Sequence, residues 1–157
     1  MRVFLAGASG VIGVRLIPLL VRDGHEVAGM TRSPGKAAAL RELGAEPVVC
    51  DVFDAGALAQ AVTAFGPELV MHQLTDLPDR AGQIPEFAAR NNRIRTEGTR
   101  NLLAAAAQAG ATRFLAQSIA WTPPARRRPA GCVFPRSGSG CCGRRTRVSA
   151  RPDRAGR

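Results

Sequence analysis

Residues 7–13 read Gly7-Ala8-Ser9-Gly10-Val11-Ile12-Gly13, a GxxGxxG pattern between an apolar run and a helical pattern. The first glycine permits a tight strand-to-helix turn, the second lets the backbone approach a diphosphate, and the third lets the helix pack closely on the sheet. Free amides and the positive end of the helix dipole favour phosphate charge, and Ser9 can add a hydroxyl donor. The alternative is that the glycines only form a turn. Strand, spacing and helix together favour a diphosphate-binding loop.

Outward from this loop, short apolar runs alternate with helical patterns across residues 1–121, which is typical of βαβ units. The predicted strands are residues 2–6, 26–30, 47–50, 68–74 and 113–119. The predicted helices are residues 11–22, a helix from Ser33-Pro34 to Gly44, a helix from Asp54 to Gly66-Pro67, and residues 86–109. Five strands and four helices predict an α/β fold of the Rossmann type, with an open, doubly wound parallel sheet.

Local patterns also predict caps and buried faces. In residues 11–22, Leu16, Leu19 and Leu20 can share one buried face. Ser33 is expected to cap the second helix, with Pro34 in its first position. Asp54 is expected to cap the third helix, which buries Leu58, Val62 and Phe65.

Residues 122–157 differ sharply in composition. They contain ten Arg and one acid, Asp153, for a net charge of +9, whereas residues 1–121 hold 12 basic and 11 acidic residues. Val133, Phe134 and Val148 are the only large aliphatic or aromatic residues in this part. They are too few to offset the entropy of ordering, so we expect a disordered basic tail. Our hypothesis is that the chain is truncated, the tail being read out of frame or past a truncation in a GC-rich gene.

Composition argues against several classes of protein. No run of eighteen apolar residues is present, so no membrane span is expected. Cys50, Cys132, Cys141 and Cys142 form no CxxC pair, so we expect no metal site and no disulfide framework, and we interpret the protein as cytoplasmic with reduced thiols. The arginines of the tail could contact nucleic-acid phosphates, but no aromatic platform or helix-turn-helix accompanies them, and nucleic acid is not an expected partner.

Three motifs carry a resemblance to a known group. GASGVIG at residues 7–13, Asp51-Val52 after the third strand, and EGTRNLL at residues 97–103 resemble extended or atypical short-chain dehydrogenases/reductases, often called the NAD-dependent epimerase/dehydratase family. The resemblance covers residues 1–121 and implies a nicotinamide dinucleotide cofactor and the strand order 3-2-1-4-5. It also implies that Asp51 and Val52 lie beside the adenine. The residues implied beside the nicotinamide-side ribose are Gln73, Leu74 and Thr75.

Other readings of these positions remain open. Asp51 could simply cap the loop after the third strand. His72 lies in an apolar strand and is interpreted as a packed histidine rather than a catalytic one. Asn92 is similar to a helix asparagine that supports the active-site region in the family, and a solvated surface asparagine is the alternative.

The end of the second strand bears on the choice of cofactor. An NAD-specific site usually places Asp or Glu there to bind the ribose 2′-hydroxyl. This chain has no carboxylate at that point, and Arg32, with Ser33 and Lys36 nearby, can instead hold a 2′-phosphate. The alternative is that the two cations are solvated charges at a helix start. We predict NADP(H) in preference to NAD(H).

The catalytic parts of the family are missing. Family members use a Tyr-x-x-x-Lys pair after the fifth strand for proton transfer, but this chain has no tyrosine and a single lysine, Lys36. Ser118 falls near the family's Ser/Thr position and is the one catalytic candidate. We therefore expect a cofactor-binding domain of an oxidoreductase or epimerase that is catalytically incomplete, with a non-catalytic NADP(H)-sensing module as the alternative. The substrate stays open, as does the oligomeric state, with a homodimer through the helix at residues 86–109 as one option.

Overall fold

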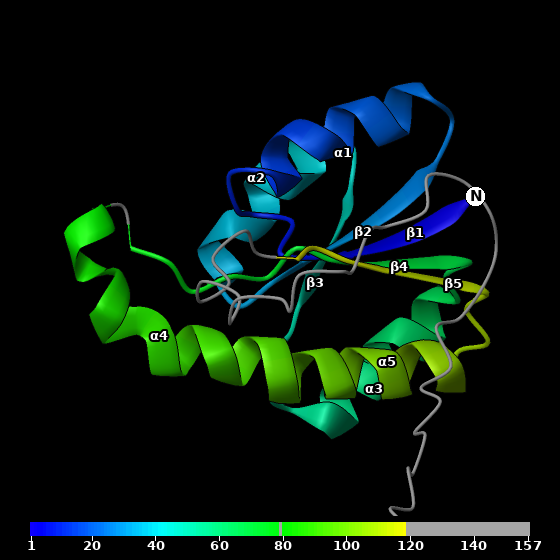
Figure 1. The fold of residues 1–157 in the computed structure, drawn as a ribbon. Coiled ribbons are helices and arrows are strands. Elements are labelled where there is room, and N and C mark those ends of the chain that lie inside the picture. The colour runs from blue at the N-terminus through cyan, green and yellow to red at the C-terminus, as the bar shows by residue number, and fades with distance from the viewer. Residues whose placement is uncertain (79, 119–157) are drawn as a thin grey trace, which may run out of the picture. The chain divides into compact units, whose positions relative to one another are not determined.

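The computed structural model describes residues 1–78 and 80–118 (Figure 1). Five parallel strands form one sheet in the order β3-β2-β1-β4-β5, so the predicted fold class and strand order are confirmed. The strands are β1 Arg2–Ala6, β2 Glu26–Thr31, β3 Glu46–Val49, β4 Leu69–His72 and β5 Arg113–Ala116. The strand β2 is one residue longer than predicted, and β4 ends two residues earlier. The predicted tail, the domain boundary at residue 121 and Ile119 of the predicted fifth strand lie outside the described residues.

Helices cover both faces of the sheet, with α1 and α2 on one side and α3 and α5 on the other (Figure 1). The helical elements are α1 Gly13–Arg22, η1 Pro34–Lys36, α2 Ala37–Glu42, α3 Ala55–Phe65, η2 Ala81–Gln83, α4 Ile84–Arg93, η3 Ile94–Gly98 and α5 Thr99–Gln108. None of the helices within this described part combines the length and apolar character needed to cross a bilayer.

Side-chain alternation along the strands creates two separate cores. On β1, Leu5 packs into the core under α1 and α2, whereas Phe4 and Ala6 pack into the core under α3 and α5. All three side chains are fully buried. The first core is small and includes Ile17 and Leu40; the second is larger. The central strand is therefore apolar on both faces, as a doubly wound sheet requires.

The buried face of α1 differs from the prediction. Leu16 and Leu20 are half-buried against the sheet, but Leu19 is 46% exposed and Ile17 is fully buried in its place. Residues 13, 16, 17 and 20 repeat at the three- and four-residue spacing of one helix face, and Leu19 lies off that row. The prediction was wrong at Leu19. It placed Leu16, Leu19 and Leu20 on one face, whereas the buried row begins at Gly13 and does not include Leu19.

The two predicted helix caps have different outcomes. The carboxylate of Asp54 accepts a hydrogen bond from the Ala57 amide at 3.0 Å, so the cap of α3 is confirmed. Leu58, Val62 and Phe65 are buried as expected. Ser33 precedes a short 3₁₀ turn rather than an α-helix, and its side chain makes no capping bond. Its own amide donates to the Thr31 hydroxyl at 3.2 Å instead.

The long helix predicted at residues 86–109 is divided by one π-helical turn, η3. Such turns insert one extra residue into an α-helix and are frequent at functional sites. The Thr99 hydroxyl donates to the Arg95 carbonyl at 2.7 Å and so satisfies a backbone group within the turn. The turn therefore changes the rotation of α4 relative to α5 without leaving that carbonyl unpaired.

Substitution of Gly7 tests the turn that follows β1. Gly7 has φ +92°, and a Cβ built there would lie 2.8 Å from the backbone of Gln73, whereas Gly24 has φ +80° and no atom within 4 Å of its Cβ position. Gly24→Ala therefore isolates the cost of the left-handed backbone, about 1–2 kcal/mol. We expect Gly7→Ala to lower the free energy of unfolding by about 1–3 kcal/mol more than Gly24→Ala does, because the backbone of Gln73 must also move. Urea titrations measure both, and equal losses would contradict this close packing.

Candidate functional site

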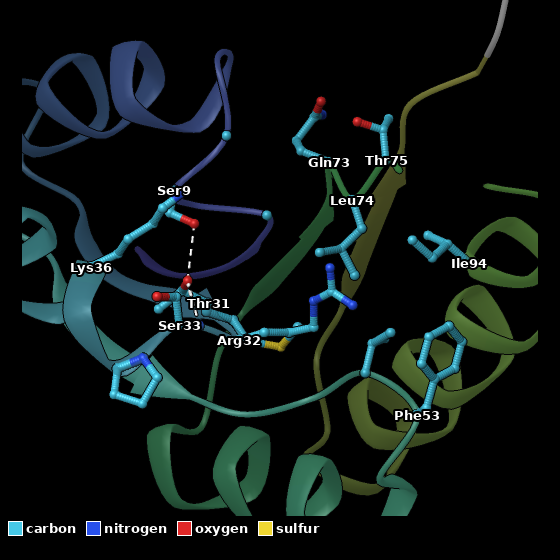
Figure 2. A pocket seen from close by; sticks show the side chains of 15 residues that line it. Ser9, Thr31, Arg32, Ser33, Lys36, Phe53, Gln73, Leu74, Thr75 and Ile94 are labelled. Atoms are coloured by element: carbon cyan, nitrogen blue, oxygen red, sulfur yellow. Dashed lines mark hydrogen bonds between the residues drawn. The ribbon is translucent and has the colours of Figure 1, made fainter. Parts of the chain in front are cut away.

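A cleft of about 590 Å³ opens at the carboxyl ends of the strands (Figure 2). Its walls come from the turn after β1, the end of β2, the loop after β3, the loop after β4, and η3. The lining residues are Gly7, Ser9, Gly10, Met30, Thr31, Arg32, Ser33, Pro34, Lys36, Val52, Phe53, Gln73, Leu74, Thr75 and Ile94. This is the edge of an open α/β sheet where ligands bind, since α1 after β1 and α5 after the neighbouring β4 lie on opposite sides of the sheet.

The glycine turn lies at the floor of the cleft and is closely packed. A Cβ at Gly13 would lie 2.3 Å from the Ala8 carbonyl oxygen, so only glycine lets α1 begin at this distance from the turn. A Cβ at Gly10 would lie 3.3 Å from the Gly7 carbonyl oxygen, which is a tight contact for an alanine. The absence of side chains leaves the backbone of the turn open to the cleft.

The first residues of the α1 region offer hydrogen-bond donors. Within the described residues, no hydrogen bond engages the amides of Val11 and Ile12, and their side chains are 74% and 48% exposed. Ile12 occupies the cap position of α1 and provides no side-chain cap. The Ser9 hydroxyl lines the cleft and lies 2.9 Å from the Thr31 hydroxyl. These donors stand at the positive end of the helix dipole, which favours an anion.

The wall at the end of β2 carries the cations of the cleft. Figure 2 shows the Arg32 side chain directed into the cleft, between the walls that carry Leu74 and Phe53. Ser33 and Lys36 line the same cleft. Among the described residues, no ion pair engages Arg32 or Lys36, and no Asp or Glu lines this cleft. Within the main cleft the wall therefore presents positive charge without a carboxylate beside it, although Arg32 also lines an adjoining cavity that contains Asp51 and Asp76.

Asp51 lies outside the main cleft. It lines an adjoining cavity of about 260 Å³ together with Arg32, Phe53 and other residues. Its carboxylate accepts a hydrogen bond from the Phe53 amide at 3.0 Å, as a cap on the loop after β3 would, and its place beside the adenine stays a prediction. The other wall of this smaller cavity is stabilised by an ion pair of 2.8 Å between Arg90 and Asp76.

The loop after β4 is held by His72, a buried residue with 5% exposure. Its Nδ1 accepts a hydrogen bond from the Leu74 amide at 3.2 Å, and its Nε2 lies 3.0 Å from the Thr99 hydroxyl. Burial, and then the positive charge of Arg95, lower the pKa of His72. The prediction of a packed histidine is confirmed, and packing here also orders a wall of the cleft, because Leu74 lines it.

The π-helical turn η3 and the two helices that flank it contact the loop after β3. The Asn101 side chain donates to the Val52 carbonyl at 2.9 Å, and a Cβ at Gly98 would lie 3.3 Å from the Val52 side chain. The Arg93 guanidinium lies 3.9 Å from the centre of the Phe53 ring. These contacts place Ile94, Val52 and Phe53 along one apolar wall.

Most of the predicted cofactor-binding residues meet at the cleft. Those that line it are Gly7, Ser9, Gly10, Arg32, Ser33, Lys36, Val52, Gln73, Leu74 and Thr75. Val11, Ile12 and Gly13 belong to the turn and the start of α1 but do not line it, and Asp51 lines the adjoining cavity. Ser118 is exposed at the end of the described residues and does not line the cleft, so its catalytic role stays a prediction.

Asn92 is exposed and does not line the cleft, which matches the alternative of a surface asparagine. Its neighbour Asn91 is 5% exposed, and its side-chain oxygen accepts the Asp76 amide at 3.2 Å. Sequence reasoning also missed five lining residues: Met30, Thr31, Pro34, Phe53 and Ile94. Phe53 directly follows Asp51-Val52 and could have been found there, whereas Ile94 depends on the rotation that η3 imposes.

The fold and the cleft together define a nucleotide-binding unit of the Rossmann type. A family model described as NAD(P)H-binding matches residues 7–129, and the chain belongs to this family. The chain is 45% identical over 121 residues to a 3-diazoavenalumate denitrifying reductase of a Streptomyces species, covering 77% of this chain and 38% of that protein. It is 34% identical over 116 residues to a 3-beta-hydroxysteroid dehydrogenase of Mycolicibacterium neoaurum, covering 73% and 31%. The chain thus spans about a third of the length of these curated relatives.

Solved structures agree with this assignment. The Bordetella bronchiseptica enzyme WbmG, in complex with NAD and UDP, is 28% identical with a TM-score of 0.60, over 74% of this chain and 36% of WbmG. A short-chain dehydrogenase/reductase superfamily protein from Agrobacterium tumefaciens, with bound NAD, is also 28% identical with a TM-score of 0.56, over 74% and 32%. The resemblance to short-chain dehydrogenases/reductases is confirmed.

The lowered pKa of His72 predicts a pH dependence of stability. Because the unfolded chain binds this proton at a higher pH than the folded protein does, stability is full above the usual histidine pKa of about 6.5 and falls as the pH drops below it. We expect His72→Asn to remove this part of the slope below about pH 6.5, and His25→Asn to retain it. Urea titrations across this range measure the slope. An unchanged slope in His72→Asn would show that another group causes it.

Proposed function

We propose that residues 1–121 bind NADP(H) in the cleft, in preference to NAD(H). The observation that carries this proposal is the pair Arg32 and Lys36. Both line the cleft, no ion pair within the described residues engages them, and no carboxylate faces them there. A dinucleotide with an extra phosphate supplies the missing negative charge.

The glycine turn fits the diphosphate of such a cofactor. A Cβ at Gly7 or Gly13 would collide with neighbouring backbone, so glycine is needed at both positions, and no side chain there covers the backbone of the turn. The amides of Val11 and Ile12 and the hydroxyl of Ser9 are donors at the positive end of α1. Hydrogen bonds from such donors to a charged oxygen are stronger than bonds to a neutral one. These residues would hold the diphosphate.

The wall at the end of β2 fits the 2′-phosphate. The guanidinium of Arg32 offers paired donors in a planar fork, Lys36 offers a point charge, and Ser33 offers a hydroxyl. NAD(H) has a hydroxyl at this position, which a carboxylate would bind, and none lines the cleft within the described part of the chain. This difference supports the preference for NADP(H).

The remaining walls fit the two ends of the cofactor. Val52 and Phe53, with Asp51 in the adjoining cavity, would lie beside the adenine. The loop after β4, with Gln73, Leu74 and Thr75, would lie beside the nicotinamide-side ribose. The NAD bound by WbmG supports a dinucleotide at this place in the fold. The exposure of Asn92 speaks against a direct contact from that residue.

Removal of the Arg32 side chain tests the cofactor preference. A hydrogen bond to a charged group is worth about 1.5–3 kcal/mol, so Arg32→Ala should weaken NADPH binding about ten- to a hundredfold. NADH binding should change much less, because NADH lacks the 2′-phosphate. Arg41→Ala is the matched control, since Arg41 is exposed on α2 and does not line the cleft. Isothermal calorimetry measures the affinities of the unaltered protein and of both variants for NADPH and for NADH.

Two outcomes would contradict the proposal. Equal affinities of the unaltered protein for NADPH and NADH, with no effect of Arg32→Ala, would remove the 2′-phosphate site. Absence of heat with either dinucleotide, on protein whose folding is verified by circular dichroism, would remove the dinucleotide site as a whole.

We further propose that this chain alone does not complete an oxidoreductase or epimerase reaction. A bound nicotinamide supplies hydride transfer, but the sequence has no tyrosine to exchange a proton with a substrate oxygen, and its single lysine lines the β2 wall. A non-catalytic NADP(H)-sensing module is the second candidate, and the missing tyrosine favours it. We expect NADPH to bind without oxidation in the presence of a panel of aldehydes and ketones. The nicotinamide absorbance measures this, and steady turnover would contradict the proposal.

A further inference from the structure

His72 links two walls of the cleft through its ring. It is the last residue of β4 and pairs with Ala6 of β1 and Ala116 of β5. Its Nδ1 contacts the amide of Leu74, 3.2 Å away, and its Nε2 contacts the hydroxyl of Thr99, 3.0 Å away. Both ring nitrogens are therefore engaged, one by the loop after β4 and the other by α5.

The donors in this network determine the tautomer. A backbone amide can only donate, so Nδ1 must carry a lone pair, and the proton of the neutral ring must reside on Nε2. Nε2–H then donates to the Thr99 hydroxyl, which in turn donates to the Arg95 carbonyl at 2.7 Å. The chain of bonds runs in one direction, from Leu74 through His72 and Thr99 to the π-helical turn η3. Only the neutral Nε2–H form satisfies all three bonds.

Both ends of this chain of bonds reach the cleft. Leu74 lines one wall, and Ile94, beside Arg95 in η3, lines another. The same loop is close to the glycine turn, because the Gln73 amide donates to the Ala6 carbonyl at 2.8 Å and the Cβ position of Gly7 lies 2.8 Å from the Gln73 backbone. A shift of Leu74 and Gln73 would therefore move the wall beside the diphosphate loop as well.

We propose that His72 is a positioning residue for the dinucleotide: its neutral ring holds Leu74 and thereby sets the loop after β4 against the glycine turn. The inference rests on the proposed function and adds to it a way in which acid weakens the site. A protonated ring would turn an Nδ1–H toward the Leu74 amide, and two donors cannot bond each other. Within the described residues, the charged group that faces the ring is Arg95 of η3, whose lowering of the His72 pKa the backbone of Ile94 opposes; β1 and β5 present Ala6 and Ala116 at the paired positions, and α5 presents Thr99.

Two substitutions separate the two ring nitrogens. The side-chain oxygen of His72→Asn can replace Nδ1 and accept the Leu74 amide, but its shorter chain does not extend to Thr99. The amide nitrogen of His72→Gln can replace Nε2 and donate to Thr99, but it leaves the Leu74 amide without an acceptor. We expect His72→Gln to weaken NADPH binding by about fivefold or more at neutral pH, and His72→Asn to stay within about twofold of the unaltered protein. Calorimetry measures the affinities.

A second measurement follows the loop without any ligand. Hydrogen exchange of the Leu74 amide, observed by NMR, should accelerate in His72→Gln and remain slow in His72→Asn. On acidification through the lowered pKa of His72, NADPH affinity should fall more steeply in the unaltered protein than in His72→Asn, where the 2′-phosphate of the cofactor, with a second pKa of about 6, still titrates. Melting temperatures of both variants show that each is folded under the conditions used.

The outcomes distinguish this inference from the proposed function. Equal losses of affinity in both variants, or no loss in His72→Gln, would overturn the positioning role, because simple packing would then account for the ring. Unchanged exchange of Leu74 in His72→Gln would overturn it as well. If the unaltered protein binds no NADPH while the exchange pattern is as expected, the proposed function fails and the control of the loop by His72 stands.

Discussion

The site depends on the close approach of two backbone segments, the turn after β1 and the loop after β4. The strands β1 and β4 are neighbours with Ala6 opposite His72, so both segments leave the sheet at the same level. At Gly7 they come so close that a Cβ would lie 2.8 Å from Gln73. A side chain there would separate them and tilt the start of α1 away from the cleft. The bare turn, the exposed amides and the order of the neighbouring loop are thus consequences of one packing constraint.

Repeating patterns predicted the fold more reliably than the buried faces. Alternation of apolar runs and helical segments gave the five strands, and the family resemblance gave their order, which the structure confirms. The predicted buried face of α1 was wrong at Leu19, because the buried row starts at Gly13, which has no apolar side chain to reveal it in the sequence. Ser33 has the residue type of a cap, yet its amide bonds Thr31 and a 3₁₀ turn follows. The capping propensity of serine does not predict this bond to a hydroxyl two residues earlier.

The predicted residues that line the cleft are those whose positions are local in sequence. Gly7, Ser9 and Gly10 belong to one motif, and Arg32 with Lys36 to another. Ile94 could not be found this way, because its place depends on the π-helical turn. Asn92 was named for its residue type, whereas the buried row at residues 102, 98 and 94 extends back by three residues to Asn91, which leaves Asn92 on the exposed face. A helix row is therefore a better guide than a residue type at one position.

The distribution of charge supports the proposed binding of a phosphate in the cleft. Residues 1–121 are nearly neutral, with 12 basic and 11 acidic residues, so no general excess of charge within this part of the chain attracts a phosphate. The neighbouring acids have other partners: Asp76 pairs with Arg90, Glu97 pairs with Arg93, and Asp51 accepts the Phe53 amide. Arg93 is thereby occupied, and Arg32 and Lys36 are the cations of the cleft that no ion pair within the described residues engages. A concave wall of low polarity strengthens the field of such charges. Local pairing, rather than net charge, therefore makes this cleft attractive to a phosphate.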